Sequence, residues 1–241
     1  MTYTRSKETN RSSIEMLRSL PAVFGLKDVM TLFDMPSNTD AMKAITRWKA
    51  KGWAVPFGPR AGIYFNRYIS PDHDDRKTAL DKLLRLPFVV IGMNAIRHGG
   101  WTTQRGGEIE IAVPVTASIQ THPKAYGILF CPRSPRWFDK IQDHVSTPND
   151  GIYGLPTLTP EYALADILLS KAGRLRKDKK VWDAPPDDIL PEIDDPADVI
   201  QRCLEAADTM GVSRQDMIAF LSEVEHLQDD IDEVASASLS P

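Results

Sequence analysis

The sequence contains little cysteine and no long apolar run. Its 241 residues include two cysteines, Cys131 and Cys203, and neither belongs to a CxxC pair or a Cys/His cluster. This excludes a disulfide framework or a cysteine-based zinc site, and it predicts two buried free thiols in a reducing compartment. The first residues lack the apolar core of a signal peptide, and no segment approaches the length of a membrane span. We therefore expect a cytoplasmic protein with no membrane partner.

Common catalytic motifs are also missing, including a P-loop, a Rossmann glycine pattern and a serine-hydrolase elbow. Glu108 and Glu110 lie two residues apart on a predicted strand, so their carboxylates point the same way and could share a divalent metal. No third acid accompanies them, and a strand with one solvated face explains the same residues. The sequence therefore predicts no enzymatic activity, no cofactor and no metal site. A nucleotidyltransferase-like enzyme is an alternative.

Charge is distributed unevenly along the chain, although the total is only −4. Residues 1–70 carry 11 Lys and Arg against 5 Asp and Glu, a net charge of +6. Residues 71–177 carry 14 against 11, and residues 178–241 carry 4 against 17, a net charge of −13. A cationic segment suits phosphate groups and an acidic one repels them, so the two ends should have different partners.

The segment 26–65 has the pattern of a winged helix-turn-helix. A short apolar helix at 26–33 leads through the turn 34–38 into a second helix from Thr39 to about Lys51, which Gly52 ends. Two β-prone arms around a Gly/Pro tip follow and predict a hairpin. Helix, tight turn, basic helix and hairpin in this order place one helix in a DNA groove. DNA binding is therefore the first hypothesis.

The second helix of this motif has one apolar and one polar face. Helical spacing predicts a buried stripe of Ala41, Ala44, Ile45 and Trp48. Ser37 or Asn38 is expected to cap the helix by accepting an exposed backbone N–H. The outer face is left to polar and charged residues.

Three cations of this segment suit nucleic acid in different ways. Arg47 can bind a guanine edge through two hydrogen bonds, Lys43 suits a phosphate, and Arg60 at the hairpin tip suits a phosphate or the minor groove. Charged helix faces are often merely solvated, but the turn and hairpin favour DNA contact here. The candidate DNA-binding residues are Ser37, Asn38, Thr39, Lys43, Thr46, Arg47 and Arg60. The alternative is an interaction module whose winged helix binds another protein.

The remaining pattern predicts an α+β fold in three parts. A winged helix-turn-helix at 1–70 is followed by a mixed α/β domain at 71–182, with strands expected near 88–91, 108–115, 127–131 and 152–155. Residues 183–241 should form an acidic linker, a C-terminal helical pair and a tail. A basic run at 174–180 is either a solvated helix end or a further phosphate-binding patch.

Several motifs resemble the AbiEi-type antitoxin family. Residues 90–100, which end in His-Gly-Gly, resemble a strand and helix of that family, and residues 110–114 resemble its "v-a-v-p" strand. Residues 154–168 resemble its "t-p-e-r-a-l-x-D-l-l" helix. In the winged helix, Lys51-Gly52-Trp53 and Gly62-Ile63-Tyr64 resemble the family's "k-G-l" and "G-v-Y". Together the motifs extend over residues 20–172.

This resemblance implies an antitoxin that also represses its own promoter, in a toxin–antitoxin or phage-defence operon. The implied partners are double-stranded promoter DNA with repeated operator sites and a nucleotidyltransferase-like toxin. Two features depart from the family: Tyr162 stands where the family often has Arg, and the acidic region after Asp183 has no match. The operator, the toxin and the oligomeric state are left open.

Overall fold

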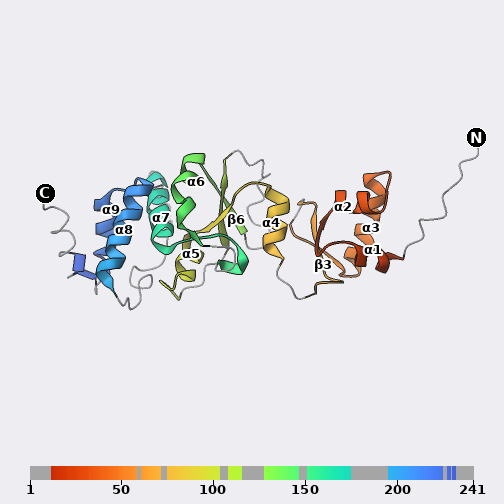
Figure 1. Ribbon diagram of the computed structural model, residues 1–241, viewed down its shortest axis with the longest axis horizontal. Helices are drawn as coiled ribbons and strands as arrows, with labels where there is room; N and C mark the ends of the chain where they lie inside the picture. Colours follow the sequence, from red (N-terminus) through yellow and green to blue (C-terminus); the bar gives the residue numbers. More distant parts are fainter. Residues whose placement is uncertain are drawn as a thin grey trace, which may run out of the picture. The chain divides into compact units, whose positions relative to one another are not determined.

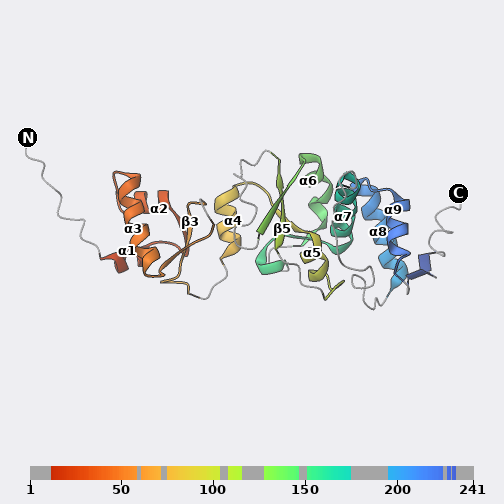
Figure 2. The same cartoon turned by 180° about the vertical axis from the view of Figure 1, so that it is seen from behind.

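The computed structural model has an α+β fold with two sheets in the described part of the chain (Figures 1 and 2). Residues 12–58, 61–71, 75–103, 108–115, 128–146, 151–174, 195–224, 227–228 and 230–231 are described. The chain divides into two units, Met1–Leu86 and Pro87–Pro241. No helix among these residues is long and apolar enough to cross a membrane.

The first unit combines short helices with a three-stranded antiparallel sheet of order β1-β3-β2. Ser12 and Glu15 form a capping box at the start of its first helix, because each side chain accepts the other residue's backbone N–H. In chain order the elements are α1 (Ser13–Ser19), β1 (Val23–Gly25), α2 (Leu26–Leu32), α3 (Asn38–Ala50), β2 (Ala54–Pro56), β3 (Ile63–Asn66) and α4 (Arg76–Leu84).

The core of the first unit contains the predicted stripe of α3. Ala41, Ile45 and Trp48 are buried and Ala44 is partly buried, which confirms the stripe. The indole of Trp48 meets the ring of Phe24 edge to face at 6.1 Å, and Phe24 stacks on Tyr64 at 5.6 Å. These contacts join α3 to β1 and β3 and fix which face of α3 points outward.

Helix α4 belongs to the first unit, whereas the sequence assigned it to the second domain. It packs on β3, and the Lys82 ammonium lies 2.5 Å from a carboxylate oxygen of Asp28 on α2. Figures 1 and 2 both show α4 on the side of the sheet away from α3. The predicted boundary after residue 70 therefore moves to Leu86.

The second unit has a five-stranded mixed sheet of order β6-β5-β4-β8-β7. The pairs β5–β6 and β4–β8 are parallel, and β4–β5 and β7–β8 are antiparallel. In chain order its strands and α-helices are β4 (Val89–Ile91), α5 (Gly92–His98), β5 (Ile109–Pro114), β6 (Ile128–Arg133), α6 (Pro135–Ile141), β7 (Val145–Ser146), β8 (Thr157–Leu158), α7 (Pro160–Arg174), α8 (Pro196–Met210) and α9 (Arg214–Leu221).

Two predictions for strands of this unit were wrong in detail. Residues Ile152–Gly154 form a 3₁₀ turn, because Leu155 donates its backbone N–H back to Ile152 at 2.8 Å. The strand begins only at Thr157. On β5 the expected solvated face is limited to Glu110, because β5 is an inner strand between β6 and β4 and its residues from Ile111 to Pro114 are buried.

The predicted C-terminal helical pair is folded and forms part of the second unit. Helix α8 packs on α7, and α9 packs on α8, so the three helices follow one another away from the sheet in both views. The apolar stripe of these two helices is buried at Ile200, Leu204, Met217 and Leu221, and Phe220 is partly buried. Cys203 is also fully buried, and burial raises the pKa of its thiol. Both cysteines are buried thiols, as predicted.

A buried carboxylate links the sheet of the second unit to its helices. Asp166 on α7 is 1% exposed and accepts hydrogen bonds from Arg133 at 3.0 and 2.7 Å and from the Trp137 indole at 2.7 Å. Burial alone would lower the pKa of Arg133, but its hydrogen bonds with Asp166 and the charge of that carboxylate raise it above its ordinary value. One side chain therefore joins β6, α6 and α7.

We predict that Asp166→Asn destabilises the second unit by about 3–5 kcal/mol, because it leaves the buried charge of Arg133 without its anion. Hydrogen–deuterium exchange of α7 amides in the full-length protein measures this change. The matched control is Asp208→Asn, because Asp208 also binds an arginine, Arg214, but is about half exposed. Equal protection of α7 in wild type and Asp166→Asn would contradict the prediction.

Candidate nucleic-acid interface

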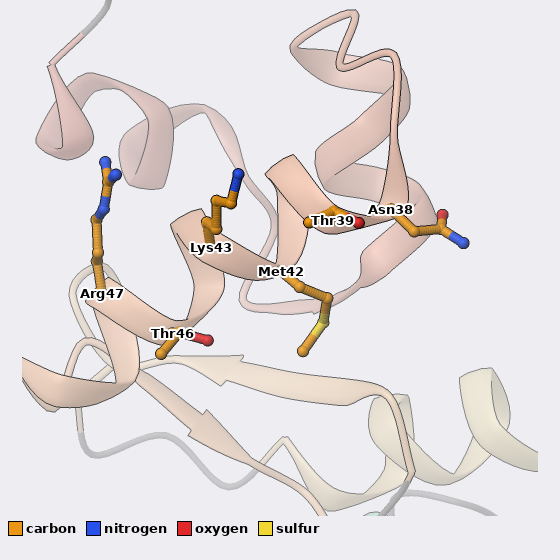
Figure 3. A pocket seen from close by; sticks show the side chains of 6 residues that line it. All are labelled: Asn38, Thr39, Met42, Lys43, Thr46 and Arg47. Atoms are coloured by element: carbon orange, nitrogen blue, oxygen red, sulfur yellow. The ribbon is translucent and has the colours of Figure 1, made fainter.

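The outer face of α3 forms an open depression of about 570 Å³ in the first unit (Figure 3). The residues lining it are Asn38, Thr39, Met42, Lys43, Thr46 and Arg47. Five of these are among the predicted DNA-binding residues, so the fold brings most of that set together. Met42 was not predicted. Asn38, Met42 and Thr46 follow one another at intervals of four residues, so helical spacing would have placed Met42 on this face.

Ser37, rather than Asn38, caps α3. Its hydroxyl accepts the backbone N–H of Asp40 at 3.2 Å, while Asn38 is the first residue of the helix and is exposed. The backbone N–H groups of the first turn therefore lie at the N-terminal end of the face, beside Asn38 and Thr39. A helix N-terminus of this kind attracts anions.

A short hydrogen-bonded chain crosses the first turn of α3. The Ser37 hydroxyl donates to one carboxylate oxygen of Asp40 at 2.8 Å, and the Lys43 ammonium donates to the other at 3.3 Å. The hydrogen bond from Ser37, followed by that from Lys43 and its charge, holds the pKa of Asp40 below its ordinary value. The Lys43–Asp40 pair is largely solvent-exposed and therefore weak, so Lys43 can exchange Asp40 for a stronger anion.

The lining side chains separate into two edges. Figure 3 shows Lys43 and Arg47 extending to one side of the helix, and Met42 and Thr46 to the other. Thr39 and Asn38 lie toward the N-terminal end. One edge is therefore cationic, and the other combines a thioether with a hydroxyl and a methyl group.

The hairpin that follows α3 pairs β2 with β3, so that Val55 lies opposite Phe65. Arg60, which the sequence predicts at the hairpin tip, lies outside the described residues, as do residues 175–180 of the predicted basic run. The arms of the hairpin are joined near the tip by a hydrogen bond from the Phe57 backbone N–H to the Ile63 carbonyl at 2.8 Å.

The predicted carboxylate pair lies in the second unit. Glu110 pairs across the sheet with Ile91, and its carboxylate covers Gly92, where a Cβ would lie 1.7 Å from one carboxylate oxygen. A side chain at Gly92 would displace this carboxylate, and the φ of +68° is a left-handed conformation that favours glycine. The backbone carbonyl of Glu108 accepts a hydrogen bond from Asn94. No group of three or more His, Cys, Asp or Glu residues suited to a metal occurs within the described ranges.

Two of the motifs that resemble the antitoxin family meet at the start of α7. Gly99 lies against Pro160, and a Cβ on Gly99 would be 2.5 Å from Cγ of that proline. The aspartate of the second motif is Asp166, which holds Arg133 and Trp137. Tyr162 stacks on His144 at 3.7 Å. These residues have packing roles in this fold.

No family model matches the chain, and no curated protein matches it. Among solved structures, it is similar to the one described as the crystal structure of RV2827C protein from Mycobacterium tuberculosis. The sequence identity is 17%, the TM-score is 0.49, and the alignment covers 88% of this chain and 80% of that one.

We predict that Ser37→Ala weakens the first turn of α3 by about 1 kcal/mol, because the Asp40 N–H loses its acceptor. Ser37→Thr keeps a hydroxyl and should retain most of this free energy. Hydrogen–deuterium exchange of α3 amides measures the change. Ser19→Ala removes an exposed hydroxyl that binds the backbone of its own helix and serves as a control. The capping role would be rejected if the Ser37 and Ser19 variants exchanged alike.

Proposed function

We propose that the first unit is a winged helix-turn-helix domain that binds double-stranded DNA, with α3 in the major groove and the β2–β3 hairpin as the wing. The observation that carries this proposal is the outer face of α3, which collects cationic and hydrogen-bonding side chains and no acidic ones in its depression. The order helix, strand, two helices and hairpin around a three-stranded sheet also supports it.

The dimensions of α3 suit this role. Its 13 residues extend about 20 Å at 1.5 Å per residue, and the major groove of B-DNA is about 12 Å wide and accepts one helix. Trp48 and Ile45 are buried on the opposite side, so the helix can enter a groove without exposing the core. The net charge of +6 on residues 1–70 favours association with phosphates.

Different side chains of this face contact different parts of the DNA. Lys43 contacts a phosphate after leaving Asp40, and Arg47 contacts a phosphate or a guanine edge. Asn38 and Thr39 lie at the N-terminal end, where the free N–H groups of the helix also favour a phosphate. Thr46 lies in the middle of the face and faces base edges.

We expect Arg47→Ala and Lys43→Ala each to weaken binding to duplex DNA and to flatten the log–log salt dependence by about 0.9 for each phosphate that the variant no longer neutralises. Fluorescence anisotropy of the full-length protein on labelled duplex DNA, measured across a salt series, gives both values. Lys77→Ala is the matched control, because it removes the same charge from α4, across the sheet from α3. An equal effect of all three variants would indicate general charge attraction, and no binding by wild type would reject the proposal.

We further propose that the full chain is the antitoxin and autorepressor of a toxin–antitoxin or phage-defence operon, and that it counteracts a nucleotidyltransferase-like toxin. The support is the resemblance of its motifs to AbiEi-type antitoxins. The proposed DNA-binding face lies in the first unit, so neutralisation can depend on the second unit. The acidic charge of residues 178–241 suits a basic surface on a partner.

This role predicts that two activities separate by unit. In cells that express the proposed toxin, the product of the adjacent gene, Arg47→Ala should lose promoter repression but still restore growth. Asp166→Asn, which we expect to destabilise the second unit, should restore growth poorly. Reporter expression and growth rate are measured at matched protein levels. Failure of the wild type to restore growth would reject the antitoxin role and leave the proposed DNA binding intact.

A further inference from the structure

Met42 is an exposed apolar side chain in the middle of the polar face of α3. It is 39% exposed, whereas Ala41, Ile45 and Trp48 on the opposite side of the helix are buried. Its side chain therefore does little for the packing of the first unit. A lone exposed methionine is ordinary on a protein surface. Here, however, it lines the same depression as Lys43 and Arg47, the side chains proposed to contact DNA.

The side chains around Met42 make an edge distinct from the cationic one. Met42 and Thr46 extend together to the side opposite Lys43 and Arg47 (Figure 3). Thr46 adds a methyl and a hydroxyl group, and Asn38 adds an amide. A thioether is flexible and polarisable, so it adapts to a small apolar group without a fixed geometry. This edge offers apolar contact flanked by hydrogen-bonding groups.

The edge of a thymine in the major groove has the matching chemistry. It exposes a 5-methyl group beside the O4 acceptor, and it is the only one of the four bases with an apolar group there. Protein side chains contact this methyl with apolar groups and with the methyl of threonine. A cationic edge on phosphates and an apolar edge on a base would use both sides of α3 in one groove.

The composition of the face favours a nucleic acid over a protein partner. Protein interfaces are enriched in aromatic residues, methionine and arginine, and they are depleted of lysine and acidic residues. The residues lining this depression include no aromatic side chain, two cations and one large apolar side chain. One methionine offers too little apolar surface for a protein interface, but it is enough to contact one or two methyl groups.

We propose that Met42, supported by Thr46, is a specificity-determining residue that contacts a thymine 5-methyl group in the major groove. The inference rests on the proposed DNA binding by α3 and specifies its target, a duplex site with thymine opposite Met42. Lys43 and Arg47 act on the other edge, and Met42 selects the thymine.

The test removes single methyl groups from the DNA. Full-length wild-type protein first selects duplexes from a random library. Each thymine of the selected duplex is then replaced, one at a time, by deoxyuridine, which lacks only the 5-methyl group. Wild type should bind about fourfold more weakly at one or two of these positions, the effect of removing one buried methyl-sized group. Met42→Ala should bind the unmodified duplex more weakly, and it should not respond to deoxyuridine at those positions.

Matched variants separate this contact from other effects. Lys43→Ala should weaken binding but keep the full response to deoxyuridine, because it acts on the opposite edge. Met42→Leu should keep part of the response. Melting temperatures should be unchanged, because Met42 is exposed. The methyl contact would be overturned, and the proposed DNA binding kept, by either of two results. In the first, wild type binds DNA but no deoxyuridine substitution weakens it; in the second, the substitutions weaken wild type and Met42→Ala equally. If wild type binds no duplex, including at low salt, the proposed DNA binding is rejected with it.

Discussion

The aromatic contact between α3 and the sheet of the first unit determines what that unit can present to a partner. Trp48 packs on Phe24, and Phe24 stacks on Tyr64, so three elements distant in sequence meet at one point. Removing a buried tryptophan typically costs about 3–5 kcal/mol, a large part of the stability of a small domain. Because this contact fixes the rotation of α3 about its axis, it also decides that Thr39, Lys43 and Arg47 face outward. The proposed interface therefore depends on a core contact that touches none of its residues.

The second unit is organised around the buried carboxylate of Asp166. Asp166 draws hydrogen bonds from β6 and α6 to α7, and α8 and α9 are then stacked on α7. Buried charges are costly unless they are paired and hydrogen-bonded, and Asp166 meets both conditions. The consequence is that α8 and α9 pack on a helix that Asp166 joins to the sheet.

Much of the local structure could be predicted from the sequence, because it depends on near neighbours in the chain. The capping box at Ser12 and Glu15, the buried stripe of α3, the end of α8 at Gly211 and the buried stripe of the C-terminal helices all follow from helical spacing and capping chemistry. Most of the α3 face followed as well, because a helix with one buried stripe has only one outer face. Short strands could not be predicted in the same way. Val23–Gly25 has too few residues to show a period, and it forms a strand because β3 provides its hydrogen-bonding partners.

The sequence by itself determined the helices other than α6, the outward residues of α3 and the uneven charge, since each depends on residue type and spacing along the chain. Only the tertiary structure decided which elements share a unit. Helix α4 joined the first unit through Lys82 and Asp28, which are far apart in sequence. Asn66 is a polar residue that is fully buried, and the fold provides a partner for its amide, which donates to the Leu17 carbonyl of α1. Asp166 likewise appears in the sequence as an ordinary acid within a helix. Its partners Arg133 and Trp137 are brought to it by the fold, because hydrogen bonds and ion pairs depend on distance in space, which spacing along the chain does not specify.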